Sequence, residues 1–160
     1  MSKLAFIFPG QGAQKAVMGK DFYENSEAAR SFFDQAQKIL DFDLKEMCFG
    51  EHEELNLTEY TQPCMVSVCL AIVQELKKRG INPDITAGLS LGEYAAVAAA
   101  GGMNELDAIK LVRRRGILMQ STVPAGEGAM AAVLGLDAKK IEEILESFEK
   151  KYPHLSISYS

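Results

Sequence analysis

The apolar positions of this chain follow two patterns, one typical of strands and the other of helices. Short apolar runs at 3–8 and 84–87 are bounded by proline or glycine and predict buried strands. Between and after them, apolar residues recur with the spacing of a helix face. Because strands and helices alternate, the first part of the chain predicts a mainly parallel α/β sheet. The predicted helices are 25–40, 61–79, 91–100 and 105–123, with short helical turns across 43–57.

A smaller strand–helix–strand unit follows the break at Pro124–Gly128. One such unit cannot bury both faces of its own sheet. We therefore expect a large α/β subdomain over 1–125, the beginning of a small subdomain over 126–160, and a chain that stops part-way through its fold. The elements expected in the small subdomain are a strand at 129–136, a charged helix capped by Asp137 and running to Lys151, and a strand at 155–159.

Composition and charge exclude several classes of protein. The 160 residues are enough for one domain with a real core, and the net charge of −5 argues against a nucleic-acid binder. No apolar run approaches the length of a membrane span, and the first residues lack the layout of a signal peptide. Cys48, Cys64 and Cys69 lack the spacing of metal ligands. We interpret them as reduced thiols of a cytoplasmic protein, and we expect no metal site.

The segment Gly88–Gly92, Gly-Leu-Ser-Leu-Gly, lies between a predicted strand and a predicted helix. Here Ser90 can occupy a very sharp turn that projects its hydroxyl above the sheet as a nucleophile, and the glycines avoid a clash across that turn. Ser90 and Glu93 also fit a capping box, in which the serine only satisfies N–H groups at the helix start. That alternative does not explain Gly92, which costs a helix roughly 0.5–1 kcal/mol relative to alanine. The motif alone leaves both interpretations open.

A glycine-containing loop follows the first predicted strand. Its Gly10-Gln11-Gly12 suggests a dinucleotide-binding fingerprint, but Lys15 stands where the third glycine would be. A loop of this kind can instead offer a backbone N–H to an oxyanion, at Gln11, together with the N–H of Leu91 after the serine. A plain tight turn is the alternative.

Three consecutive arginines, Arg113 to Arg115, have the look of a solvated charge run, but helical phase separates them. The neighbours of Arg115 three and four positions away are all apolar, whereas Lys110 is a neighbour of Arg113 and Arg114. We therefore expect Arg115 to face the core, where a guanidinium requires a partner. That partner is either an internal carboxylate or the carboxylate of a ligand.

Several separated motifs together resemble those of the malonyl-CoA:acyl-carrier-protein transacylases, in the same order and spacing. The resemblance covers the whole chain and implies an α/β-hydrolase-like large subdomain with a ferredoxin-like small one. The motifs are Phe8–Gln14, Thr61–Pro63, Gly88–Tyr94, Arg115–Gly116 and Gly126–Val133.

The resemblance also implies functional positions. Ser90 would take the malonyl group as an ester, and Gln11 and Leu91 would donate backbone N–H groups to the oxyanion. Arg115 would hold the free malonyl carboxylate, and Gln62 would help to line the pocket. The implied activity is transfer of malonyl from malonyl-CoA to the phosphopantetheine thiol of acyl carrier protein in fatty acid biosynthesis, without metal or redox cofactor.

Two departures from the family pattern stand out. Family members usually have histidine where this chain has Leu89, so we expect an altered hydrogen bond there. They are also about twice as long and carry their general-base histidine in the second half, whereas His52 and His154 match no family motif. We therefore expect little activity from this chain without the remaining half. A serine esterase with the same turn, and a non-catalytic binding protein that keeps the turn as a helix cap, are the alternatives.

Overall fold

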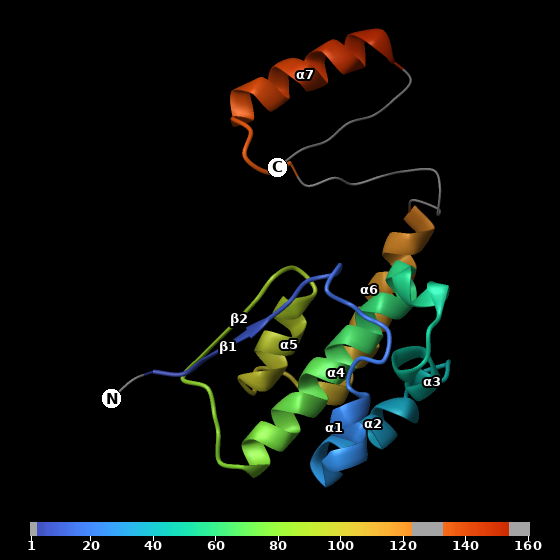
Figure 1. The fold of residues 1–160 in the computed structure, drawn as a ribbon, viewed down its shortest axis with the longest axis vertical. Helices are drawn as coiled ribbons and strands as arrows, with labels where there is room; N and C mark the ends of the chain where they lie inside the picture. Colours follow the sequence, from blue (N-terminus) through green and yellow to red (C-terminus); the bar gives the residue numbers. More distant parts are fainter. Residues whose placement is uncertain (1–2, 123–132, 154–160) are drawn as a thin grey trace. The chain divides into compact units, whose positions relative to one another are not determined.

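The computed structural model of the chain describes residues 3–122 and 133–153, which fall in two compact units, Met1–Glu127 and Gly128–Ser160. In the first unit, β1 (Ala5–Phe8) and β2 (Ile85–Gly88) pair as parallel strands, with Ala5 opposite Ile85 and Phe8 opposite Gly88 (Figure 1). The two strands predicted for the first part of the chain and their parallel α/β arrangement are thereby confirmed. The prediction that they are buried is wrong: of the eight strand residues only Phe8 is buried, and Ile7 and Ile85 are 77% and 54% exposed. Parallel pairing brings the carboxyl ends of both strands to the same edge of the sheet.

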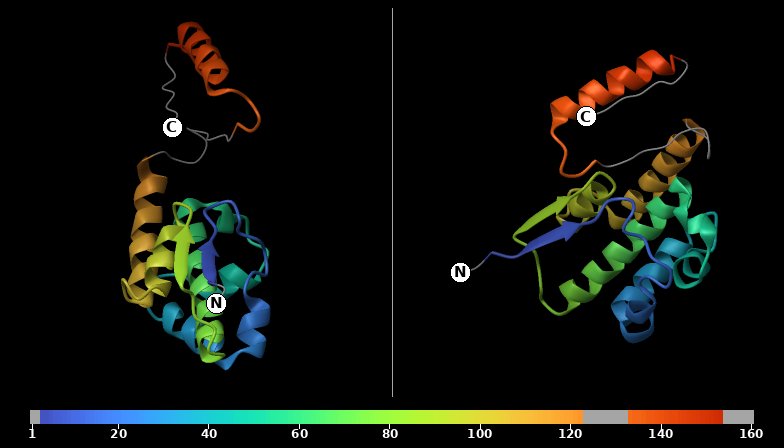
Figure 2. Two further views of the ribbon diagram at one scale, coloured as in Figure 1. Left: turned by 90° about the vertical axis from the view of Figure 1, so that its left-hand side faces the viewer. Right: turned by 45° about the horizontal axis from the view of Figure 1, so that its top comes forward.

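Helix α5 (Gly92–Ala99) packs directly against this pair of strands, and α4 (Thr58–Lys78) and α6 (Glu105–Thr122) pack against α5. The longest, α4, is buried along most of its length, and α6 runs alongside it in Figures 1 and 2. The helix that follows β2, α5, contacts both strands and buries four of its alanines. The helices of this unit are α1 (Lys20–Asn25), α2 (Glu27–Gln37), α3 (Leu44–Phe49), α4 (Thr58–Lys78), α5 (Gly92–Ala99) and α6 (Glu105–Thr122), with a 3₁₀ turn, η1, at Glu53–Asn56.

Two helix boundaries differ from the sequence prediction. The predicted helix 25–40 begins at Glu27, because the Ser26 hydroxyl accepts a bond from the Ala29 N–H at 3.0 Å and caps α2; residues 20–25 form the separate helix α1. Helix α4 begins at Thr58, one turn before the predicted start at Thr61. Pro63 therefore lies beyond the first turn, where proline removes a helical hydrogen bond.

The second unit contains α7 (Ala138–Lys151), which Asp137 caps as predicted by accepting a bond from the Lys139 N–H at 3.0 Å. Residues 133–136 are not in a strand, so the prediction of a strand there is wrong for this stretch. The rest of that strand, the strand expected at 155–159 and the 125/126 boundary lie outside the described residues. No helix of 3–122 or 133–153 has the length and apolar character needed to cross a membrane.

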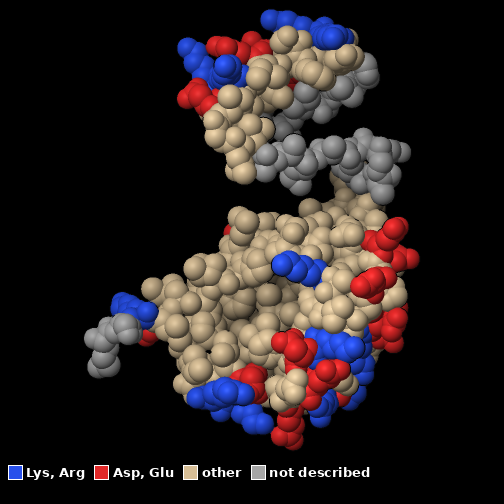
Figure 3. Space-filling view, in the orientation of Figure 1, with Lys and Arg blue, Asp and Glu red and all other residues tan. Residues whose placement is uncertain are grey.

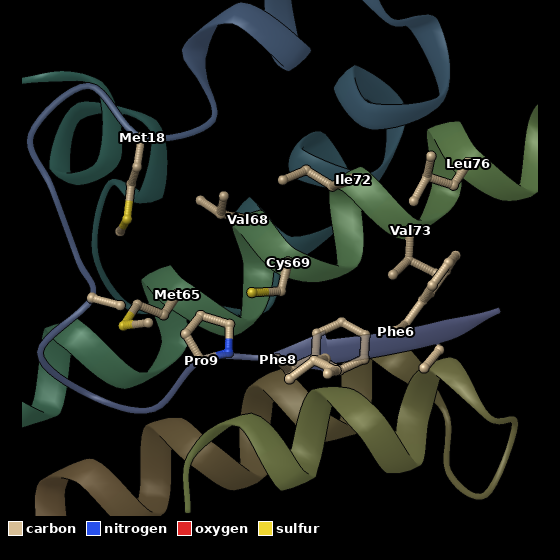
Figure 4. A pocket seen from close by; sticks show the side chains of 13 residues that line it. Phe6, Phe8, Pro9, Met18, Met65, Val68, Cys69, Ile72, Val73 and Leu76 are labelled. Carbon is tan, nitrogen blue, oxygen red and sulfur yellow. The ribbon is translucent and has the colours of Figure 1, made fainter. Parts of the chain in front are cut away.

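An apolar groove of about 460 Å³ lies between β1 and α4. Apolar side chains of both elements point into it from opposite sides, among them Phe6 and Phe8 from the strand and Val68 and Ile72 from the helix (Figure 4). In the space-filling view, few charged side chains lie around this hollow (Figure 3). Most of the charged side chains on this face of the unit gather below the hollow. A contiguous apolar surface of this kind marks an interaction site or a ligand groove.

Candidate active site

Two loops meet where the parallel strands end. β1 is followed by Pro9-Gly10-Gln11 and β2 by Leu89-Ser90, so both loops leave the same edge of the sheet. The Leu89 N–H donates to the Phe8 carbonyl at 3.1 Å, which extends the strand pairing into the loops. A Cβ on Gly10 would lie 2.9 Å from the Leu89 carbonyl oxygen, so the absence of a side chain lets the loops touch. In parallel sheets this edge is where ligands bind.

Ser90 sits at the top of a strained turn. Its φ of +49° lies in the left-handed region, which non-glycine residues seldom adopt and which occurs preferentially at functional sites. A Cβ on Gly88 would collide with the backbone of Gly92 and Glu93, and a Cβ on Gly92 would collide with the Phe8 carbonyl. The predicted reason for both glycines, a close approach across the turn, is thus confirmed.

The side chain of Ser90 does not cap helix α5. The N-cap position is Leu91, and no side chain donates or accepts a capping bond there. The Glu93 N–H bonds to the backbone carbonyl of Ser90, at 3.2 Å, rather than to its hydroxyl. The capping-box interpretation is therefore wrong, and the hydroxyl is available for other partners.

Arg115 is the partner that the structure gives this hydroxyl. Its Nη2 donates to Ser90 Oγ at 3.1 Å, and its guanidinium lies over the ring of Tyr94, 5.6 Å from the ring centroid. Among residues 3–122 and 133–153, no carboxylate forms an ion pair with Arg115, so the internal-carboxylate alternative finds no support there. Because Oγ accepts this bond with a lone pair, its own proton remains free to be given to a base.

Two backbone N–H groups in the two loops at this edge of the sheet have no acceptor among the described residues. Neither the Gln11 nor the Leu91 N–H bonds to any described residue, although the N–H groups next to them at Gly12 and Gly92 do. Free N–H groups at such a turn are what a developing oxyanion requires. The geometry is compatible with the predicted pair, whose role stays a prediction.

Gln62 lies behind the Gln11 loop. It is fully buried, and its Nε2 donates to Gln11 Oε1 at 3.5 Å and contacts the Met119 sulfur at 3.3 Å, while its own Oε1 has no partner among the described residues. Gln11 Nε2 in turn donates to Thr58 Oγ1 at 3.0 Å. In this structure Gln62 therefore supports the Gln11 side chain; the predicted contact with substrate is not tested.

The expectation that the apolar stripe around Arg115 faces the core is wrong. Leu111, Leu118 and Met119 are 43–49% exposed, and Arg115 is only partly buried.

Arg113, which was expected on the solvated face, is instead enclosed by other elements. Its side chain is 13% exposed, and its Nε and Nη2 donate to the two carboxylate oxygens of Asp41, each at 2.9 Å. Nη1 donates to the Glu59 carboxylate at 3.1 Å. The two hydrogen bonds that Arg113 donates to Asp41 lower the pKa of the Asp41 carboxyl. The buried Gly116, three residues on, was the available signal in the sequence that this face meets another helix.

The cysteines do not compete with Ser90 as nucleophiles. Cys48 and Cys64 are fully buried. The hydrogen bond between the Cys48 thiol and Cys64 is the largest cause that raises the pKa of Cys48 well above its usual value, and burial adds to it. Burial raises the pKa of Cys69 to about 11. Thiols with such pKa values are not thiolates at neutral pH and are unreactive.

No base stands next to the serine within the described residues, where Arg115 is the only hydrogen-bond partner of Ser90 Oγ. His52 instead bonds to Glu46, at 3.1 Å between Nε2 and Oε1, and His154 lies outside the described residues. No group of three or more His, Cys, Asp or Glu side chains in 3–122 or 133–153 is placed to hold a metal ion.

Residues 5–158 match the family model of the acyl transferase domain. The chain belongs to this family. This acyl transferase domain is 48% identical over 147 residues to the malonyl CoA-acyl carrier protein transacylase of Bacillus subtilis, a match that covers 91% of this chain and 46% of that protein. The resemblance found in the sequence motifs is therefore confirmed.

Solved structures agree with the sequence relatives. The malonyl CoA-acyl carrier protein transacylase from Clostridium perfringens matches with a TM-score of 0.82 at 42% identity, over 95% of this chain and 48% of that one. A malonyl-transacylase in complex with its type II PKS acyl-carrier protein matches with a TM-score of 0.85 at 38% identity, over 94% and 49%. These likenesses confirm the predicted fold class. This acyl transferase domain spans about half the length of the relatives that it matches.

Proposed function

We propose that the chain supplies the nucleophile of a malonyl-CoA:acyl-carrier-protein transacylase that serves fatty acid biosynthesis in the cytoplasm. The observation that carries this proposal is the bond from Arg115 Nη2 to Ser90 Oγ, which places an uncommitted cation beside a candidate nucleophile. Malonyl-CoA pairs a thioester with a free carboxylate a few bonds away. The names of the relatives support this choice of substrate, and the free thiols of the described residues support the compartment.

The reaction has two matched steps. A base removes the Ser90 proton, Oγ attacks the thioester carbonyl, and the N–H groups of Gln11 and Leu91 stabilise the resulting oxyanion. The carbon–sulfur bond then breaks, and coenzyme A leaves as a thiol after taking the proton from the base. The phosphopantetheine thiol of the carrier protein attacks the Ser90 ester in the same way, and the serine regains its proton.

Arg115 selects the acyl group in this scheme. The malonyl carboxylate takes over the guanidinium donors, which releases the Ser90 hydroxyl for attack. An acetyl group offers no carboxylate and leaves the guanidinium without an anionic partner, so acetyl-CoA is disfavoured. A serine esterase would use the same turn, but its neutral ester would give Arg115 no anionic partner.

The base comes from the part of the family's length that this chain does not span. Two features support this. The serine hydroxyl has no basic partner among the described residues, and the groove between β1 and α4 presents an apolar surface that no described residue of the first unit covers. The complementary half would cover that surface and bring the base to Ser90.

The test mixes the chain with the C-terminal half of the Bacillus subtilis relative and measures malonyl transfer to acyl carrier protein. We expect little turnover from either half and a clear gain from the mixture, since only the mixture combines nucleophile and base. Hydrolysis of p-nitrophenyl esters by the mixture is the control for the esterase alternative. Robust malonyl transfer by the chain alone, or a mixture that prefers the esters, would contradict the proposal.

A further inference from the structure

One face of α6 is fixed against the first turn of α4. Arg113 Nη1 donates to the Glu59 carbonyl at 2.8 Å, and the Thr58 N–H donates to Gln120 Oε1 at 3.1 Å. Between them, a Cβ on Gly116 would lie 2.8 Å from the Thr58 carbonyl oxygen, so only glycine allows this approach. Positions three and four residues apart share one face of a helix. We call these contacts of Arg113, Gly116 and Gln120 with Thr58–Glu59 the α4–α6 seam.

The seam uses a carbonyl that the sequence of α4 leaves free. Within a helix, the Glu59 carbonyl would accept a bond from the N–H of residue 63, but Pro63 has none. Arg113 supplies the missing donor. The fork of its guanidinium is fixed by Asp41, and the guanidinium lies over the rings of Phe42 and Tyr60, at 5.2 and 5.0 Å from their centroids.

The seam connects directly to the candidate active site. Thr58, through its hydroxyl, also accepts the bond from Gln11, whose loop carries a predicted oxyanion donor. Arg115 follows Arg113 by two residues, which is about 200° around the helix, so it leaves α6 on the side away from the seam and reaches Ser90. Because side chains extend the helix radius to about 5–6 Å, a rotation of about 20° would move the Arg115 tip by about 2 Å.

We propose that Arg113 is a positioning residue: through the α4–α6 seam it sets the rotation of α6 and so holds the Arg115 guanidinium at Ser90. Arg113 touches neither Ser90 nor a substrate. Its effect on substrate choice rests on the function proposed above, whereas its control of where Arg115 lies does not.

The alternative is that Arg113 only adds stability, in which case its loss lowers the free energy of unfolding but leaves Arg115 in place. Arg114 provides a matched control, because it is exposed, sits on the same helix and has no ionic or hydrogen-bond partner among the described residues. An R114A variant makes the same chemical change without touching the seam. Lysine at 113 keeps the charge but cannot form the fork to Asp41, so R113K is not expected to rescue.

NMR of the chain tests the positioning directly. Nuclear Overhauser effects between Arg115 and the Tyr94 ring, and the ring-current shift of the Arg115 Hε, report where the guanidinium lies; the backbone amide spectrum reports folding. We expect R113A and R113K to lose both Arg115 signals while α4 stays folded, and R114A to keep them. Unchanged Arg115 signals in folded R113A would overturn the proposal.

A milder variant decides the matter should R113A fail to fold. D41N removes one anionic partner of Arg113 and leaves the bonds to Glu59, so the Arg115 signals should weaken in part; wild-type signals in both D41N and R113K would overturn the proposal. These readouts need no catalysis, so a failure of the proposed function is recognised separately. In the active mixture of halves, R113A should lower the malonyl-to-acetyl preference about tenfold or more, but not when Arg115 is already alanine.

Discussion

Replacement of Arg115 by alanine is expected to lower kcat/KM for malonyl-CoA by roughly 30-fold or more and to remove the preference over acetyl-CoA. The estimate takes the lower end of the about 2–5 kcal/mol that loss of one partner costs a hydrogen-bonded charge pair, since this site is partly open to solvent. The acetyl group has no carboxylate that Arg115 could bind, so kcat/KM for acetyl-CoA should change little. The rates of acyl transfer from malonyl-CoA and from acetyl-CoA, measured in the mixture of halves, give the ratio of the two kcat/KM values.

The matched control is R114A, whose side chain is exposed on the same turn of α6. It should keep the malonyl preference of the unmodified chain. An R115A variant with an undiminished preference for malonyl-CoA would show that the guanidinium beside Ser90 does not read the acid group, whatever happened to the overall rate.

Gly92→Ala is expected to destabilise the fold by about 1–3 kcal/mol, although alanine normally favours a helix. Its Cβ would collide with the Phe8 carbonyl and lie 2.7 Å from the Pro9 carbonyl oxygen. Both are backbone atoms at the end of β1 and cannot swing aside as a side chain can. Helix α5 would have to move away from β1, and the turn that carries Ser90 would move with it. Urea unfolding followed by circular dichroism measures the change in free energy.

Glu93→Ala places alanine at the next position of the same helical turn, where the side chain is exposed. Loss of its charge at the helix N-terminus should cost no more than about 1 kcal/mol. If the G92A chain is as stable as the unmodified one, the account of the turn is contradicted, because there would then be room for a side chain between Gly92 and the end of β1.

Features encoded by local sequence could be predicted well. The strands at 5–8 and 85–88 and the Asp137 cap follow from short patterns whose physics lies within a few residues. A similar pattern wrongly predicted a strand at 133–136, so such a pattern is not sufficient by itself. The Ser90 turn could be predicted because a glycine on each side is unfavourable unless the backbone passes very close. Excluding the helix cap required coordinates, since it depends on where one hydroxyl points.

The features that were missed depend on partners far away in the sequence. Arg113 looked solvated because its own helix offers Lys110 as a neighbour, but its anionic partner Asp41 is 72 residues away. The start of α4 at Thr58 is likewise supported by Gln120, 62 residues on. Helical periodicity describes which residues share a face; it does not say which other element will pack against that face.

The residues of the predicted site also differ in how far the sequence could predict their positions. The family motifs placed Arg115 at the serine, and the structure brings the two within a hydrogen bond. The apolar neighbours of Arg115 were a misleading signal, because three of the four are exposed rather than packed in the core. The hydrogen bond from the fully buried Gln62 to the Gln11 side chain could not be predicted without coordinates, because it joins residues 51 positions apart. The roles of Ser90, Arg115, Gln11, Leu91 and Gln62 in catalysis and binding stay predictions.

The central claim, that Ser90 carries the acyl group, is tested most directly by intact-mass and peptide mass spectrometry of the chain. The chain, mixed with the complementary half, is exposed to malonyl-CoA without carrier protein. The account predicts one malonyl group per chain, found on the peptide that contains Ser90 and absent from the S90A variant. A malonyl group that persists in S90A, or that maps to another residue, would contradict it.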